Sequence, residues 1–431
     1  MRLFLALWSA LWSLALPAIL LYLRRRGRKD PLYAQHLGER FGRYAMPMPG
    51  AVWVHAVSLG ELRSAVPLIR ALLNRGERVV ITHFTPAGRR EAARVFATEI
   101  KAGQLQPVWI PLELNWCFKG FFRSFRPKLG LVMEVEIWPR LTFAARDAGV
   151  PLYMCNAGYP SKSVARDAKF PLRPAVMRGF AGALVKSQMQ AERFAAVGVQ
   201  NIHVTGELRF DQPIPEALLE AAPAARAALA QSRPVITFAS VVEGEDDTYL
   251  TAIEAALKAP NPPFIIYVPR KPERFDETAE IIAARGLKAI RRSQIFTESL
   301  TLRPEAAPAL QGPDILIGDS LGEMYFYLAM ADRTVTGGGF TPHGAHNIIE
   351  PLALGRPVIV GPAIHTIEYP AVEAIAAGVC FHAKGAEDLP RALDPTLWPG
   401  PSSAEIEAFL QAHSGATARS LAVLEPLLTS R

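Results

Sequence analysis

Carboxylates and arginines follow strand-like runs at several points of the chain, where an α/β protein places reactive groups. The run VWVHAV leads through SLGE into a helical pattern, so Glu61 lies at a strand-to-helix junction. Glu134 and Glu136 follow LGLVM, and Arg209 follows IHV. Alternate residues of an extended segment face the same way, so both glutamates can enter one cleft, although such pairs are often surface charges. A carboxylate at such a place can remove a proton from a hydroxyl.

The stretch around Glu61 also has a purely structural interpretation. Ser58 followed three residues later by Glu61 has the spacing of a capping box, in which each side chain satisfies backbone N–H groups at the start of a helix. This stretch alone does not decide between a cap and a base.

The window TVTGGGFTPHGAHNIIEPLALG has the residues of an anion site. Gly337–Gly339 close a strand-like run and residues 347–354 look helical, so we expect backbone N–H groups to face an anion. Glu350 lies one helical turn after His346 and Asn347, and its carboxylate suits a ribose diol. The alternative is a glycine turn before a solvated helix. The window has neither a Walker lysine nor GxGxxG, which argues against an NTPase or a dinucleotide oxidoreductase.

Two further loops follow strand-like runs in this half of the chain. YVPRKPERF places Arg270 and Lys271 in a loop bounded by prolines, which suits a phosphate, although a solvated charge pair fits as well. GDSLGEM supplies Gly322 and Glu323 at a predicted helix start. These loops and the glycine window form one candidate phosphate site.

Strand-like and helical runs alternate through both halves of the chain, which is typical of parallel sheets with helices on both faces. The predicted strands are VWVHAV, VVITHF, LGLVMEV, PLYMCNA, GALVKS and IHVTG, then PVITFAS, PFIIYVP, DILIGD, RTVTGGG and RPVIVG. The Ala- and Pro-rich residues 211–234 are predicted as a linker with a short helix. We therefore predict a segment 1–30 followed by α/β domains over 31–222 and 223–431.

Composition narrows the class of partner. With 47 Lys and Arg against 40 Asp and Glu, the net charge of +7 fits nucleic acid, phospholipid or a phosphorylated substrate. The chain has three cysteines and no CxxC pair, so neither a disulfide framework nor a zinc site is predicted.

The first residues predict a membrane anchor. LFLALWSALWSLALPAILLYL is uncharged and about long enough to span a bilayer, and RRRGRK follows it directly. Its basic residues place the rest of the chain on the cytoplasmic side, facing anionic headgroups. Pro17 would kink a spanning helix, so the segment either spans the bilayer or lies in one leaflet. The basic residues gather beside this anchor, and no aromatic-studded basic strand is present, so no nucleic-acid partner is predicted.

The motifs together resemble the Kdo transferase family of lipopolysaccharide synthesis. The resemblance rests on GERFG, HAVSLGE, MEVEIWP, TGELRFD, EGED, VPRKPERF, GDSLGEM and HNIIEP, in that order. It implies an α/β fold of the GT-B type, with two Rossmann-like domains facing a cleft. It also implies inverting transfer of 3-deoxy-D-manno-octulosonic acid (Kdo) from CMP-Kdo to the lipid A precursor lipid IVA, at the cytoplasmic face of the bacterial inner membrane.

The resemblance assigns roles to residues of this chain. Glu61 falls on the catalytic base, which the helix N-terminus would keep ionised, and Glu134 and Arg209 support the transition state. The residues implied in holding CMP are Pro269, Arg270, Leu321, Gly322, Glu323, Asn347, Ile348, Ile349 and Glu350. CMP is an acidic leaving group and Arg270 can neutralise its phosphate, so neither a general acid, a metal nor a cofactor is implied, with CMP-Kdo the donor substrate.

The chain departs from the family pattern at several places. NAGYPSKS stands where many bacterial members have NARLSxRS, Val241 and Val242 replace a Thr-His pair before EGE, and Ala345 replaces a glycine. Two alternatives follow: a paralogue using a related sugar acid or another glycolipid, or a non-catalytic nucleotide-binding protein at the membrane. Neither the number of Kdo residues added nor the oligomeric state is predicted.

Overall fold

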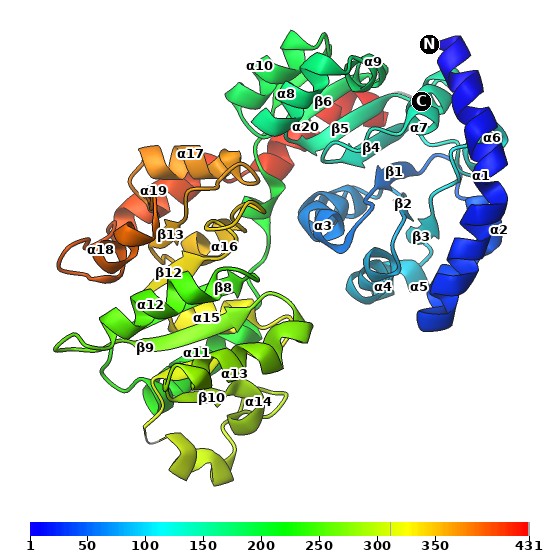
Figure 1. The fold of residues 1–431 in the computed structure, drawn as a ribbon. Coiled ribbons are helices and arrows are strands. Elements are labelled where there is room, and N and C mark those ends of the chain that lie inside the picture. Colours follow the sequence, from blue (N-terminus) through cyan, green and yellow to red (C-terminus); the bar gives the residue numbers. More distant parts are fainter. Residues whose placement is uncertain (311, 430–431) are drawn as a thin grey trace. The chain divides into compact units, whose positions relative to one another are not determined.

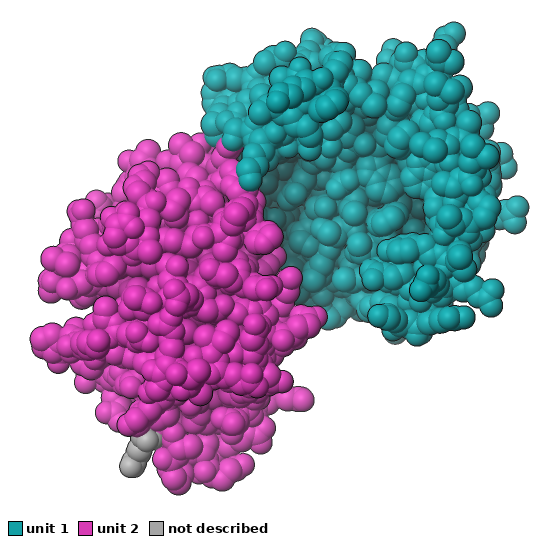
Figure 2. Space-filling view, in the orientation of Figure 1, with its two compact units in different colours: residues 1–212, 414–431 teal, residues 213–413 magenta. Residues whose placement is uncertain are grey.

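The computed structural model describes residues 1–310 and 312–429, which divide into two compact units (Figures 1 and 2). Unit 1 consists of residues 1–212 and the C-terminal segment that begins at Ser414, and unit 2 consists of Pro213–His413. Each unit is built around a parallel sheet with helices packed on it, so the predicted class of two α/β domains is confirmed.

Unit 1 contains a parallel sheet in the order β3-β2-β1-β4-β5-β6-β7. Its strands are β1 (Val52–His55), β2 (Val79–His83), β3 (Leu105–Trp109), β4 (Leu129–Met133), β5 (Leu152–Ala157), β6 (Gly182–Val185) and β7 (Ile202–Val204). Its helices are α1 (Arg2–Lys29), α2 (Leu37–Arg40), α3 (Leu59–Asn74), α4 (Pro86–Val95), α5 (Ala97–Lys101), α6 (Asn115–Phe125), α7 (Pro139–Asp147), α8 (Ser161–Lys169), α9 (Leu172–Met177), α10 (Gln188–Ala196) and α20 (Ala416–Thr429), with 3-10 turns η1 (Pro31–Tyr33) and η2 (Leu208–Asp211). The chain reverses its direction of winding between the neighbours β1 and β4, which is where α/β sheets bind ligands.

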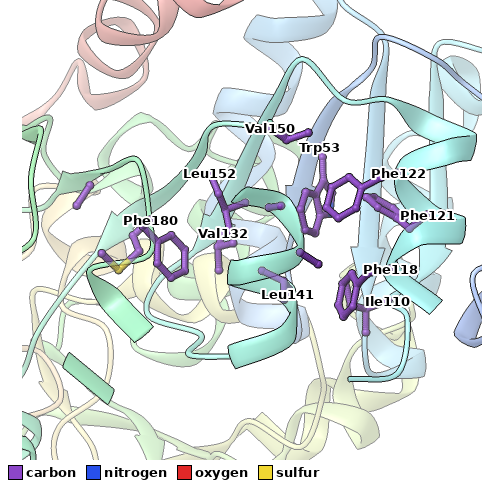
Figure 3. Close-up of a cluster of buried hydrophobic side chains, with 14 of the residues drawn as sticks. Trp53, Ile110, Phe118, Phe121, Phe122, Val132, Leu141, Val150, Leu152 and Phe180 are labelled. Carbon is purple, nitrogen blue, oxygen red and sulfur yellow. The ribbon is translucent and has the colours of Figure 1, made fainter. Parts of the chain in front are cut away.

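An aromatic cluster fills one side of the unit 1 sheet (Figure 3). Trp53 of β1 is fully buried, its indole N–H donates to Thr82 Oγ1 at 2.7 Å, and its ring lies 4.9 Å from that of Phe121. On β4 beside it, a Cβ atom at Gly130 would lie 2.5 Å from Leu152 Cδ1. It would also lie 2.9 Å from Trp53 Cε3, so the glycine leaves room for the indole that packs against Phe121 of α6.

The last helix, α20, belongs to unit 1 although it follows all of unit 2. Leu424 and Leu428 lie in the core beneath α3, and the Asp211 carboxylate accepts from the backbone N–H groups of Gly415 at 2.7 Å and Thr417 at 2.6 Å. The predicted domains, 31–222 and 223–431, therefore differ from the two units. Unit 1 includes the first residues and the segment from Ser414, and unit 2 begins at Pro213. A linear division cannot show that the chain returns to its first sheet.

The helix predicted within residues 211–234 is present as α11 (Glu216–Leu229), but it belongs to unit 2 and is not part of a linker. Ala222, Ala225 and Leu229 are buried in the core beside α15. Arg226 donates to Asp332 Oδ2 at 2.7 Å. The alanines that suggested a linker are the small side chains that let two helices pack closely.

The unit 2 sheet is also parallel, in the order β10-β11-β9-β8-β12-β13-β14. Its strands are β8 (Val235–Val241), β9 (Phe264–Pro269), β10 (Ala289–Arg291), β11 (Ile315–Ile317), β12 (Arg333–Thr336), β13 (Val358–Val360) and β14 (Cys380–His382). Its other helices are α12 (Asp246–Ala256), α13 (Phe275–Ala284), α14 (Arg292–Ile295), α15 (Met324–Met330), α16 (Ile349–Ala353), α17 (Glu368–Ala376), α18 (Leu389–Leu393) and α19 (Ser403–His413), with 3-10 turns η3 (Pro272–Arg274), η4 (Pro304–Leu310) and η5 (Ala386–Asp388). The four strands β11, β9, β8 and β12 are consecutive neighbours, so the loops that follow them share one edge.

The N-terminal segment forms one helix, α1, which continues through Pro17. Within the described part of the chain, α1 is the one helix long and apolar enough to cross a membrane, by length and composition. Figure 1 shows it along the flank of unit 1, on the side of α2 and α6.

Candidate functional site: a carboxylate cluster in unit 1 and a glycine loop in unit 2

Glu61 lies in the first turn of α3, directly after β1, as predicted. Ser58 is the N-cap residue, and its hydroxyl oxygen accepts from the Glu61 N–H at 3.3 Å. The Glu61 carboxylate accepts from the Val57 N–H at 2.6 Å and from the Ser58 hydroxyl at 3.1 Å. The capping interpretation is therefore confirmed, and the same contacts fix both carboxylate oxygens. The base role stays a prediction.

The environment of Glu61 raises its pKa to about 7. Burial has the largest effect, the Val57 N–H opposes it, and the negative charges of Glu134 and Glu136 raise the pKa further. The Val57 N–H at the helix start lowers the Glu61 pKa, as expected, but burial and like charge outweigh it. A carboxylate with a pKa near 7 suits a general base at neutral pH.

Glu134 and Arg209 join Glu61 from distant parts of the sequence. Glu134 follows β4, the neighbour of β1, and has a left-handed φ of 57°. Such backbone strain in a non-glycine residue is common at functional sites. Arg209 Nη2 lies 3.5 Å from Glu134 Oε1, and Arg209 Nε donates to Ser64 Oγ of α3 at 2.8 Å. The fold thus assembles the three predicted catalytic residues.

Glu136 lies close enough to Glu61 for its charge to raise the Glu61 pKa. Its carboxylate accepts from the indole N–H of Trp138 at 2.8 Å, and burial raises its pKa. The effect of its charge on Glu61 supports the prediction that Glu134 and Glu136 face one place.

Two residues quoted only within motifs hold Arg209 in place. The buried Glu207 carboxylate accepts from Asn156 Nδ2 at 2.8 Å and from the Arg209 N–H at 3.3 Å, and pairs with Lys186 Nζ at 2.7 Å. Burial acts to raise the Glu207 pKa, but the cations of Lys186 and Arg209 lower it to about 2. Asn156 Oδ1 in turn accepts from the Leu208 N–H at 2.9 Å. The only sign in the sequence that Asn156 and Glu207 belong to the site was that they lie in the motifs NAGYP and TGELRFD.

Arg270, His346 and Glu350 come together in unit 2. Loss of hydration lowers the pKa of the Arg270 guanidinium, and the Glu350 carboxylate opposes that change. Burial lowers the pKa of His346 to about 4, and the charge of Arg270 lowers it further, so this imidazole is neutral at pH 7. The predicted grouping of a cation with the Glu350 carboxylate is therefore present.

The glycine loop differs from the prediction. The Gly337 N–H donates to Ala239 O at 2.8 Å, and the Gly338 N–H donates to Glu245 Oε2 at 2.7 Å. The expectation that these two N–H groups face a bound anion is wrong, because a buried carboxylate of the chain and a neighbouring strand accept them. Glu245 also accepts from the Phe340 N–H at 3.1 Å and from the Tyr249 hydroxyl at 2.9 Å. Glu245 is fully buried, and its carboxylate holds the backbone of the glycine loop by these hydrogen bonds.

The segment Asn347–Glu350 reaches the same edge. Asn347 Oδ1 accepts from the Ile349 N–H at 3.0 Å, at the start of α16, which is shorter than predicted. Ile348 and Ile349 bury their side chains in the core, so only their backbone is available to a ligand.

The remaining predicted donor residues lie in neighbouring loops. Pro269 is buried at the end of β9, Leu321 is 69% exposed, and Gly322 has a φ of 83°. The Glu323 carboxylate is held by Arg292 through two contacts of 2.7 Å. Glu323 therefore shapes the SLGE loop, and a ligand contact through its carboxylate stays a prediction.

Within residues 1–310 and 312–429, no group of three or more His, Cys, Asp or Glu is placed to hold a metal ion. The prediction that the reaction uses no metal remains untested. Cys117, Cys155 and Cys380 are buried and free of disulfides.

Two α/β units, each built on a parallel sheet, define the chain as a two-domain protein of the GT-B type. Solved structures share this fold. The UDP-GlcNAc 2-epimerase from Neisseria meningitidis has a TM-score of 0.56 at 13% identity, with 88% of this chain and all of that chain covered. The glycotransferase of kitacinnamycin has a TM-score of 0.50 at 16% identity, covering 89% of this chain and 100% of that one. At these identities the likeness shows the fold alone.

Sequence comparison identifies the family. Residues 35–212 match the family described as 3-deoxy-D-manno-octulosonic-acid transferase (kdotransferase). The 3-deoxy-D-manno-octulosonic acid transferase of Bordetella pertussis is 41% identical over 98% of this chain and 96% of its own, and that of Haemophilus influenzae is 30% identical over 98% of both. The chain belongs to the 3-deoxy-D-manno-octulosonic acid transferase family and is a glycosyltransferase, which confirms the resemblance.

Proposed function

We propose that the enzyme transfers Kdo from CMP-Kdo to a lipid A precursor in lipopolysaccharide synthesis, with Glu61 as the base. The observation that carries the role of Glu61 is the cluster at the ends of β1 and β4. There a fixed carboxylate with a pKa of about 7 lies beside a second carboxylate that pairs with Arg209. The names of the curated relatives supply the sugar.

In the proposed reaction, an acceptor hydroxyl gives its proton to Glu61 as its oxygen attacks the anomeric carbon of Kdo. The bond from that carbon to the phosphate oxygen breaks, CMP leaves with the electron pair, and the configuration inverts. Positive charge on the sugar grows as this bond breaks, so a nearby carboxylate such as Glu134 stabilises the transition state. Arg209 limits the repulsion between Glu134 and Glu61.

Unit 2 is proposed to hold the donor. Arg270 would bind the phosphate, and Glu350 would accept from the ribose hydroxyls. The SLGE loop and the backbone of Ile348 and Ile349 complete the proposed CMP contacts. The proposal needs no resident cofactor and no metal, because Arg270 supplies the positive charge.

Family membership and α1 are compatible with membrane association. We propose the cytoplasmic face of the bacterial inner membrane, where the glycolipid acceptor is within reach. Arg24, Arg25, Arg26, Arg28 and Lys29 support this, because all five are exposed at the end of the apolar helix and can meet anionic headgroups.

A second acceptor is kept as a candidate because of the segment NAGYPSKS. Tyr159, which stands where the usual motif has a leucine, is buried, stacks on Phe194 at 5.2 Å and donates to Asp167 Oδ2 at 3.0 Å. Asp167 also pairs with Arg166 and Arg173 at 2.8 Å and 3.3 Å. These contacts tie Tyr159 to α8, next to Gly158, which stands where the usual motif has an arginine. We therefore keep another glycolipid as the alternative acceptor.

The test is an assay of purified protein with CMP-Kdo and tetraacylated lipid A precursor, with the lipid product weighed by mass spectrometry. The expected result is lipid that gains one or more Kdo units, with CMP released in equal amount. CMP-Kdo that raises the melting temperature without any lipid product would favour the second acceptor. If the donor neither binds nor turns over, the proposed donor is wrong.

A further inference from the structure

Helix α1 has two apolar faces with different surroundings. The residues turned toward unit 1 are Leu5, Trp8, Trp12, Leu16, Ile19 and Leu23, all buried or half-buried. The residues turned away are Leu3, Leu7, Leu11, Leu14 and Leu21, all more than half exposed, with Leu14 at 81%. At 3.6 residues per turn, these two sets lie on opposite sides of the helix.

Polar contacts attach the first turns of α1 to unit 1. The Trp8 indole N–H donates to Glu113 Oε2 at 2.9 Å, and Arg140 donates to Ser9 Oγ at 2.7 Å and to Leu5 O at 2.6 Å. Glu113 is buried, and its carboxylate also accepts from the Arg140 and Leu141 N–H groups at 2.9 Å each. One carboxylate thus caps α7 and holds the membrane helix.

The middle and the end of α1 are attached as well. Trp12, Leu16 and Ile19 pack against a small apolar cluster made by Leu112, Leu114 and Cys117. Just past the last turn, Asp30 pairs with Arg90 of α4. A helix of 28 residues is about 42 Å long. Because α1 is attached to a globular unit from its first turn to its last, it cannot cross a bilayer without pulling free of these contacts.

The outer face of α1 fits one partner, the surface of an anionic lipid leaflet. From Leu3 to Leu21 it is a leucine stripe about 27 Å long at 1.5 Å per residue. Residues 1–29 contain no acidic side chain, and the stripe ends at a run of exposed basic residues, 24–29. Such a helix lies in the interface with its apolar face among acyl chains and its cations among phosphates.

We propose that α1 is an in-plane strap that lies in one leaflet and holds unit 1 on the membrane, and that it does not span the bilayer. Arg140, which holds the strap, lies in the first turn of α7, and Glu134 and Glu136 precede it in the segment that leads from β4 to that helix. An acceptor lipid then reaches the unit 1 site from the same leaflet in which the strap lies. The inference rests on the membrane location in the proposed function, but it does not depend on the reaction.

Side-specific labelling tests the topology. The three native cysteines are buried, so Arg2→Cys in the full chain gives one reactive thiol, and Lys258→Cys on the surface of unit 2 is the reference. A membrane-impermeant maleimide is applied to right-side-out and inverted bacterial membrane vesicles, with detergent giving full labelling. We expect both thiols to label from the cytoplasmic side. Labelling of position 2 from the other side, or from neither side, would overturn the strap.

Vesicle binding tests the occupant of the stripe. Leu7→Asn with Leu14→Asn changes only the outer face, and the matched control is Leu172→Asn with Leu397→Asn, two leucines exposed elsewhere. On vesicles of phosphatidylethanolamine and phosphatidylglycerol, we expect the first pair to weaken binding by at least about 10-fold and the control to leave it unchanged. Unchanged binding by the first pair would contradict the inference. So would a wild-type dimer that this pair dissociates, because a second copy would then cover the stripe.

Discussion

At the scale of single residues, the helix cap that Glu61 forms is compatible with its proposed role as the base. Its contacts with Val57 and Ser58 at the start of α3 fix both carboxylate oxygens, while burial and the neighbouring carboxylates bring its pKa to about 7. The sequence predicted the position and both roles. It could not predict the pKa, which depends on residues of another strand.

The pH dependence of the transfer rate follows from this pKa. The base must be ionised, so kcat should rise with pH through about 7 and level off above it. Glu134→Gln removes a negative charge that raises the Glu61 pKa, so the rising limb should move to lower pH while the maximal rate falls. Steady-state rates between pH 5 and 9 measure both effects. An unmoved limb in the variant would exclude electrostatic coupling of Glu134 and Glu61.

A second prediction concerns Glu245, which no sequence argument singled out. Glu245→Gln replaces one acceptor oxygen with an NH2 group that faces N–H and O–H donors of the loop and of Tyr249. We expect a loss of about 1–3 kcal/mol in stability and a raised KM for CMP-Kdo, with a smaller change in the KM for the lipid. The matched control is Glu220→Gln, at an exposed position of α11. Equal changes in both KM values would mean that Glu245 acts only on the fold.

At the scale of elements, the central strands were predictable and three edge strands were not. β3, β10 and β14 lie at ends of their sheets, and each was missed. β3 contains Pro107, which has no N–H to donate. An edge strand tolerates a proline because one of its sides forms no hydrogen bonds with a neighbouring strand. β10 and β14 have three residues each, too few for a clear apolar run. The positions of Glu61 and Glu134 were nevertheless predictable, because β1 and β4, the strands that lead to them, are central and fully buried.

The helix α20 gives a prediction at this scale. Leu424 is fully buried in the unit 1 core, so Leu424→Ala should destabilise the protein by about 2–5 kcal/mol. Leu397→Ala, at an exposed position of unit 2, should change stability by less than about 0.5 kcal/mol. Urea unfolding followed by tryptophan fluorescence compares them. Equal stability of the two variants would show that α20 does not stabilise unit 1.

At the scale of the whole molecule, the order of the motifs along the chain predicted the family and the division into two α/β domains. What it missed depends on distant contacts, namely the return of α20 to unit 1, the packing of α1 on that unit, and the support of the glycine loop by Glu245. That the two domains face a cleft stays a prediction.

Glu61 is the proposed base of Kdo transfer. The most direct test is the single-turnover rate of Glu61→Gln at saturating CMP-Kdo and lipid acceptor, with Glu192→Gln, at an exposed position of α10, as the surface control and donor binding measured separately. We predict a rate lower by roughly 10²- to 10⁴-fold with unchanged affinity for CMP-Kdo. A folded Glu61→Gln variant that transfers Kdo at the wild-type rate would show that Glu61 is not the base.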